Sequence, residues 1–179
     1  MFSVALHLSY EKYYDLRYGE NPHQDGCVYK EPNNTGCNIL NASIIQGKQL
    51  SYNNVNDADG ALATLKEFSE PTCVVVKHAN PCGVATGTDI SEVYQRAYNT
   101  DPLSAFGGII ALNRACTVAI ATHIVSVFAE IVLAPSYEPS ALEILAQKKN
   151  LRVLELGPIP PPSPRLEYRS VEGGLLAQD

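Results

Sequence analysis

The sequence predicts an α/β domain in which helices cover a largely parallel β-sheet. Between about residues 38 and 156, short apolar runs alternate with segments of helical spacing, which is the pattern of successive β-α-β units. The apolar run 73–76 is continuous, as in strands that are covered on both faces. The chain has 179 residues, 45% of them hydrophobic and 18% charged, so it can form one globular domain with a sizeable core.

The N-terminal part of the chain is rich in residues that form turns. Glycine, proline and asparagine are frequent in 15–37, so we expect an ordered loop with a short strand at 27–30. A strand-like stretch follows within 38–47. Segment 56–69 predicts a helix because its apolar residues recur at a spacing of about 3.6 residues, with Asn56 as a plausible N-cap.

Strands and helices continue to alternate beyond this helix. We expect strands at 72–78, 107–113, 130–135 and 151–156, and helices at 89–99, 117–129 and 136–150. Asp89 with Glu92 resembles a capping box, while Ser136 and Pro139 begin the last helix, which carries lysines in its final turn. Five prolines in 157–165 predict a stiff connector before the start of a further element.

Charge and composition argue against several classes of partner. The net charge is −6 and no Lys/Arg-rich run occurs, so we expect no nucleic-acid or anionic-membrane surface. Residues 1–14 are too short and polar for a signal peptide, and polar residues interrupt the apolar stretch 118–134, so we expect no membrane insertion. The five cysteines form no CxxC pair, which indicates reduced thiols and a cytoplasmic location.

Two basic side chains, Lys77 and His78, end the apolar strand of the segment VVVKHANPCG (74–83). Ligands of open α/β sheets collect beyond the carboxyl ends of strands. Lys77 would there bind an anion or a developing oxyanion, and burial would keep His78 neutral and able to accept a proton. We expect 80–83 to form a turn, in which Asn80 offers a donor and an acceptor. The alternative is that both basic side chains simply leave the sheet toward water.

Three further polar stretches are candidate ligand contacts. In LRYGENPHQ (16–24), Arg17 could clamp a phosphate or carboxylate and Tyr18 could stack on a heterocycle. In DPLSAFGG (101–108), the glycines would let the backbone approach a ligand. The asparagine-rich stretch 47–57 could form a polar rim. Each stretch also has a purely structural interpretation. The first could be a loop whose polar groups hydrogen-bond to one another, the second a plain turn, and the third a loop that caps a helix.

Other chemistries lack the required spacing. A zinc deaminase needs a glutamate two residues after its histidine and a Pro-Cys-x-x-Cys segment, but His78 and Pro81-Cys82 lack both partners. A nucleophilic pair of Cys82 and His78 lacks a third, orienting group. Neither GxGxxG nor a P-loop occurs in 101–108.

Five stretches, taken in order, resemble the transformylase part of the AICAR transformylase/IMP cyclohydrolase family. They are LRYGENPHQ, GKQLSYNNVNDADGA, VVVKHANPCG, DPLSAFGGIIALNR and EIVLAPSYEPSALEILAQKKNLRVLEL, and the likeness runs from about residue 14 onward. The resemblance implies transfer of a formyl group from 10-formyltetrahydrofolate to the 5-amino group of AICAR during purine biosynthesis. It also implies a cytidine-deaminase-like three-layer αβα unit, a homodimer with sites across the subunit interface, and no catalytic metal.

The resemblance assigns roles to individual positions. Lys77 and His78 match the catalytic pair: His78 would take the proton of the amine, and Lys77 would stabilise charge on the formyl oxygen. Glu130 lies where some family members carry an aspartate that contacts the nucleotide. Arg17 and Tyr18 match the nucleotide-contacting Arg-Tyr of the loop, and Gly107 matches a glycine that lines the nucleotide pocket. With Asn80, proposed above from its place in the turn, the positions expected to contact substrate are Arg17, Tyr18, Asn80, Gly107 and Glu130.

The resemblance also implies the organisation of the chain. We expect a lead-in at 1–14, the first deaminase-like unit at 15–156, and a connector with the start of a following element at 157–179. A cyclohydrolase domain would precede residue 1, and a second deaminase-like unit would follow. The chain is therefore interpreted as half of a transformylase, inactive alone and completed by a second half. The alternatives are a non-catalytic AICAR-binding or structural half-domain and, more distantly, a generic nucleotide-binding module.

Overall fold

The centre of the molecule is a mixed β-sheet covered by helices on both faces. The computed structural model describes residues 2–179. Its six-stranded sheet has the order β3-β8-β7-β6-β4-β5. The strands are β3 (Ser43–Gln46), β4 (Thr72–Lys77), β5 (Asn80–Thr86), β6 (Gly108–Leu112), β7 (Ala129–Ala134) and β8 (Arg152–Glu155).

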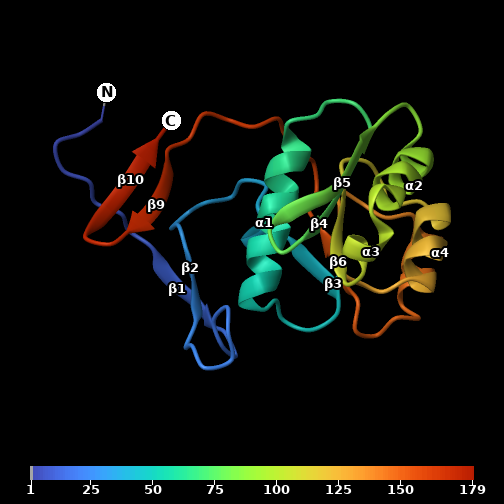
Figure 1. The fold of residues 1–179 in the computed structure, drawn as a ribbon, viewed down its shortest axis with the longest axis horizontal. Helices are drawn as coiled ribbons and strands as arrows, with labels where there is room; N and C mark the ends of the chain where they lie inside the picture. Colours follow the sequence, from blue (N-terminus) through green and yellow to red (C-terminus); the bar gives the residue numbers. More distant parts are fainter. Residues whose placement is uncertain (1) are drawn as a thin grey trace.

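The helices form the two outer layers, as Figure 1 shows for α1 on one side of the sheet and α2, α3 and α4 on the other. Their bounds are η1 (Ile39–Asn41), α1 (Tyr52–Lys66), α2 (Ile90–Thr100), α3 (Pro102–Ala105), α4 (Val118–Ser126) and α5 (Pro139–Leu145). The predicted α/β class with three layers is confirmed. The alternation of side chains along each strand produces this arrangement, because successive residues point to opposite faces.

Each face of the sheet has its own apolar core. Val74 and Val76 of β4 pack in the core beneath α1, where Leu62 and Leu65 are fully or nearly fully buried. Cys73 and Val75, the alternate residues, pack in the core that α2, α3, α4 and α5 cover. This two-sided burial explains why β4 reads as a continuous apolar run rather than an alternating one.

The strand directions are mixed, and the parallel part is the centre of the sheet. β6 pairs in parallel with β7, and β7 with β8. β4 runs antiparallel to both of its neighbours, β5 and β6, and β3 runs antiparallel to β8. The parallel character expected from the alternation of elements is therefore confined to β6, β7 and β8.

The β4–β5 hairpin corrects one local prediction. Residues 80–83 do not form a turn, because Asn80 begins β5 and pairs with Lys77, which leaves His78 and Ala79 as the connection. Pro81 and Gly83 look like turn residues in sequence. Pro81 is tolerated because β5 is an edge strand, and the register shifts between Val75 and Val76 opposite this segment.

Helix α1 begins earlier than predicted. Its N-cap is Ser51, not Asn56: the Ser51 hydroxyl accepts from the Asn54 amide, and the Asn54 side chain accepts from the Ser51 amide. This reciprocal capping box uses asparagine in place of the usual glutamate or glutamine. The segment before Asn56 is polar, so its lack of an apolar periodicity hid the first turn.

Two other caps were tested by the structure. Asp89 caps α2, because its side chain accepts from the Ser91 and Glu92 amides. The predicted capping box is not complete, since the hydrogen bonds of the described residues include none from the Asp89 amide to the Glu92 side chain. The predicted Ser136 cap of α5 is wrong, since the helix starts at Pro139 after Glu138, without a side-chain cap bond. The helix ends at Leu145, so the expected lysines lie beyond its last turn.

Two hairpins flank the layered unit. β1 (Glu11–Asp15) pairs with β2 (Cys27–Lys30), and β9 (Glu167–Val171) pairs with β10 (Gly174–Gln178). The strand predicted at 27–30 is confirmed, whereas β1 was not predicted. Figure 1 shows the β9–β10 hairpin near the N-terminal segment and away from the six-stranded sheet. Within residues 2–179 no helix is both long and apolar enough to cross a membrane.

Replacing Gly83 by alanine should destabilise the fold. A Cβ at Gly83 would overlap the carbonyl oxygen of Ala97, where β5 packs closely on α2. We expect the free energy of unfolding in urea to fall by about 1–3 kcal/mol, the usual range for overpacking. The control is Gly36→Ala, whose methyl group would meet only Asn34 Oδ1 at an ordinary 3.5 Å. Equal losses for both variants would contradict this packing argument.

Stability should decrease on mild acidification because of His123. Its Nδ1 lies 2.7 Å from the hydroxyl of the buried Tyr94, between α4 and α2. Burial lowers the pKa of His123. The unfolded chain, with a histidine pKa of about 6.5, therefore takes up this proton at a higher pH than the folded protein does. The free energy of unfolding should thus fall from about pH 7 to about pH 5.

The His123→Gln variant isolates this contribution. Urea unfolding of wild type and variant across the same pH window should show a shallower pH dependence in the variant, because glutamine does not titrate. Identical slopes would assign the effect to other groups.

Candidate active site

The candidate site lies where β4 ends beside the starts of β6 and β7. Because β4 is antiparallel to β6, its carboxyl end meets the amino end of β6, and Val76 pairs with Ile109. Gly108 in turn pairs with Ala129 at the start of β7. Lys77 lies at the carboxyl end of its own strand, as expected, but β4 is antiparallel to β6. This end of β4 therefore meets the amino ends of the parallel strands β6 and β7.

The ammonium of Lys77 is the centre of this site. It donates a hydrogen bond of 2.7 Å to the carbonyl oxygen of Gly107 and lies 4.0 Å from Glu130 Oε1. The side chains of Lys77 and Glu130 are 27% and 39% exposed. Solvent screens an ion pair of this kind, so it contributes little to stability. An ammonium has three donors, and Gly107 uses one, which leaves capacity for a ligand.

Glu130 is held from the opposite side by α1. Asn54 Nδ2 donates to Glu130 Oε2 at 2.9 Å, and Asn54 is only 5% exposed. Asn54 therefore completes the capping box of its own helix and orients the carboxylate that faces Lys77. Sequence reasoning placed Asn54 only within a general polar rim. The signal that could have singled it out is its place three residues after Ser51, in a capping box that fixes its side chain.

Gly107 lets the backbone pass close to Lys77. It has φ +68°, and its amide donates to the Phe128 carbonyl at 2.8 Å. A Cβ at this position would lie 2.9 Å from Phe128 Cε1 and 3.1 Å from Lys77 Nζ. The backbone at this glycine therefore lies close to Phe128 and Lys77, while its approach to a ligand stays a prediction.

His78 follows Lys77 into the two-residue hairpin connection. The two residues share a cavity of about 400 Å³ that Asn80, Cys82, Ser104 and Phe106 also line. His78 is exposed to water where β4 ends, and no described residue covers it. The desolvated pair of Lys77 and His78 that the sequence predicted is therefore not present. Asn80 Nδ2 donates to the His78 carbonyl at 2.8 Å, which occupies part of its predicted ligand-binding capacity.

Arg17 and Tyr18 lie in a closed loop that contacts the start of α1. Gly19 donates to the Gln24 carbonyl at 2.7 Å, and Asn53 Nδ2 donates to the Glu20 carbonyl at 3.3 Å. Arg17 is exposed, with its guanidinium carbon 5.9 Å from the Tyr18 ring centre. Among the described residues, neither Arg17 nor Tyr18 lines the cavity at Lys77, although Asn53 precedes the Asn54 that holds Glu130.

Comparison with known proteins decides the family. The family model described as "AICARFT/IMPCHase bienzyme" matches residues 1–179. The chain belongs to this family. The sequence motifs resemble the transformylase part of this family.

Curated relatives of this AICARFT/IMPCHase family member are bifunctional purine biosynthesis proteins PurH. That of Bacillus cereus is 52% identical over 175 residues, which cover 98% of this chain and 34% of the relative. That of Acetivibrio thermocellus is 52% identical over 181 residues, covering 99% and 35%. The chain thus spans about a third of the length of these relatives.

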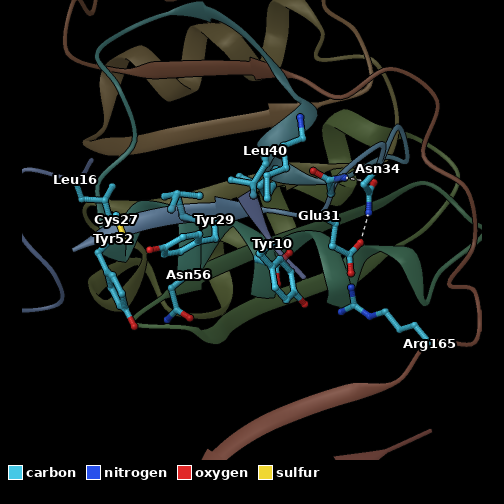
Figure 2. A pocket seen from close by; sticks show the side chains of 16 residues that line it. Tyr10, Leu16, Cys27, Tyr29, Glu31, Asn34, Leu40, Tyr52, Asn56 and Arg165 are labelled. Carbon is cyan, nitrogen blue, oxygen red and sulfur yellow. Dashed lines mark hydrogen bonds between the residues drawn. The ribbon is translucent and has the colours of Figure 1, made fainter. Parts of the chain in front are cut away.

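A second cavity of this family member lies apart from Lys77. It has a volume of about 520 Å³ and lies between the β1–β2 hairpin and α1. Figure 2 shows the side chains of Tyr10, Tyr29 and Tyr52 around it, together with Glu31, which accepts a bond of 2.7 Å from Asn34 Nδ2. Its wall includes Leu16, next to Arg17.

Replacing Gly107 by alanine should disturb the packing around Lys77, and Gly157 of the same chain provides a matched control. Gly157 has the same φ of +68° but has no atom within 4 Å of an added Cβ. Gly157→Ala should therefore lower the free energy of unfolding by only about 1–2 kcal/mol, the cost of placing a residue with a Cβ in the left-handed conformation. Gly107→Ala should lower the free energy of unfolding, measured in urea, by about 1–3 kcal/mol more, because the methyl group displaces Phe128 or Lys77. Equal losses would show that the contacts of Gly107 are not restrictive.

Proposed function

We propose that this chain carries part of the formyl-transfer site of an AICAR transformylase. In this reaction 10-formyltetrahydrofolate donates its formyl group to the 5-amino group of AICAR. The single observation that carries the proposal is the convergence of Lys77, Gly107 and Glu130, three sequence-distant positions of the family motifs, with His78 beside them. The purine biosynthesis function of the PurH relatives is consistent with this reaction.

Each residue has a definite task in the proposed reaction. The amine nitrogen of AICAR forms a bond to the formyl carbon, and His78 accepts the proton that the nitrogen loses. The free donors of Lys77 stabilise the negative charge that develops on the formyl oxygen. The bond from the formyl carbon to N10 of the folate then breaks, and N10 takes up the proton that His78 accepted, so tetrahydrofolate leaves and His78 is neutral again.

The remaining predicted residues bind the nucleotide in this proposal. Arg17 suits the phosphate, because its planar guanidinium can donate two parallel hydrogen bonds. Tyr18 offers an aromatic face next to it. Glu130 is an acceptor for hydroxyl groups, and Asn54 orients it. Gly107, whose carbonyl oxygen accepts from Lys77, is assigned to the nucleotide pocket from its place in the family motif.

A non-catalytic AICAR-binding half-domain is the second candidate function. His78 is exposed and the Lys77 side chain is 27% exposed, whereas an oxyanion contact is strong only where water is excluded. The chain also spans about a third of its relatives. We therefore infer that formyl transfer requires a covering half, supplied by further protein or by a second copy in a homodimer. We propose a cytoplasmic location, as expected for reduced thiols.

Titration of AICAR into the chain by calorimetry tests the binding part of the proposal. We expect measurable binding that Arg17→Ala weakens at least tenfold, since a charge-assisted bidentate contact contributes about 1.5–3 kcal/mol. Arg169→Ala, an exposed arginine on β9, is the matched control and should leave the affinity unchanged. Equal affinities for the two variants would reject the assignment of Arg17, and no binding by wild type would reject the AICAR site.

A formyl-transfer assay tests whether the chain needs a covering half. With AICAR and 10-formyltetrahydrofolate, the chain alone should release negligible tetrahydrofolate. Turnover by the chain alone that His78→Ala abolishes would show that no covering half is needed.

A further inference from the structure

The connection that carries His78 has an unusual backbone. His78 and Ala79 link β4 to β5 with φ of +54° and +58°, between the paired residues Lys77 and Asn80. Two positive φ values in a two-residue loop are the pattern of a type I′ hairpin, which asparagine, aspartate and glycine favour. A left-handed conformation of an L-residue with a Cβ costs about 1–2 kcal/mol, so other contacts must hold this turn.

The strongest of these contacts comes from α1. The Ala79 amide donates to Asp57 Oδ1 at 2.8 Å. These residues are 22 positions apart, so the bond ties the hairpin to a separate element. The tip amide of a two-residue loop has no strand partner, and the carboxylate provides a charge-assisted one. Gly60, one turn further along α1, lies close as well, since its Cβ would be 3.7 Å from the Ala79 carbonyl oxygen.

Asp57 also lies on the helix face that orients Glu130. Asn54 and Asp57 are three residues apart, and residues with this spacing are neighbours on one side of a helix. Asn54 bonds to Glu130, and Asp57 bonds to the turn that follows Lys77. One helix therefore contacts both Glu130, which lies 4.0 Å from the Lys77 ammonium, and the turn that follows Lys77.

We propose that Asp57 is a positioning residue that holds the His78–Ala79 turn in its left-handed conformation and so keeps the imidazole of His78 beside Lys77. The inference rests on the proposed function only in giving His78 the proton-accepting role. Asp57 itself touches the turn and acts through it.

Nuclear magnetic resonance of the 179-residue chain tests the clamp without any substrate. The Ala79 amide should exchange slowly with solvent in wild type, despite its place at a hairpin tip. Asp57→Ala should raise its exchange rate about 10- to 100-fold, the range for losing a hydrogen bond to a charged group. Asp57→Asn retains an acceptor oxygen and should restore most of the protection. Asp59→Ala, the loss of an exposed aspartate on the same helix, should change nothing.

The backbone order of His78 distinguishes positioning from a merely structural bond. Its order parameter should be near the rigid value of about 0.85 in wild type, fall below about 0.6 in Asp57→Ala, and recover in Asp57→Asn. Adding Ala79→Gly to Asp57→Ala should restore stability in part, because glycine adopts positive φ without strain. A variant in which Ala79 exchange rises while His78 stays rigid would overturn the positioning role.

The wild-type measurement keeps the test decisive if Asp57→Ala does not fold. An unprotected Ala79 amide in the folded wild-type chain would by itself overturn the inference. Failure of AICAR to bind would reject the proposed function and leave the clamp standing, since neither exchange nor backbone order depends on a ligand.

Discussion

The ammonium of Lys77 needs acceptors where β4 leaves the sheet, and the direction of β4 determines which groups provide them. Because β4 runs against β6, its last residue arrives at Gly107 and the start of β7 rather than at the carboxyl ends of those strands. The Gly107 carbonyl then accepts from Lys77 at 2.7 Å, and Glu130 supplies the counter-charge. The left-handed backbone of Gly107 is a condition for this contact, since a side chain there would meet Lys77.

Helix α1 connects this polar site to the apolar core. Leu62 and Leu65 bury against the sheet, and each such side chain contributes about 1.5–3 kcal/mol on burial. That packing sets the rotation of the helix. Asn54 and Asp57, on the first turns, consequently reach Glu130 and the Ala79 amide. The polar contacts are therefore positioned by hydrophobic packing, which is stronger than any one of them.

The site is built from one side only. Its ion pair is half-exposed, and contacts between exposed charges are weakened by water and salt. The same groups would act far more strongly under a cover that lowers the local dielectric. Exposed apolar side chains stand close by: Leu103 is 91% exposed and Phe106, which lines the Lys77 cavity, is 63% exposed. These exposed groups are the basis on which a covering half is proposed.

The sequence by itself determined the α/β class, most strands and helices, and the family motifs around Lys77, Gly107 and Glu130. Those features depend on local periodicity, on turn chemistry and on residue identity, all of which can be read along the chain. Only the tertiary structure decided the reversal of β4, the Pro81-containing edge strand, the exposure of His78, and the bond from Asn54 to Glu130 across 76 residues. An apolar run specifies that a strand is buried but not which way it runs, and contacts between distant residues follow from that direction.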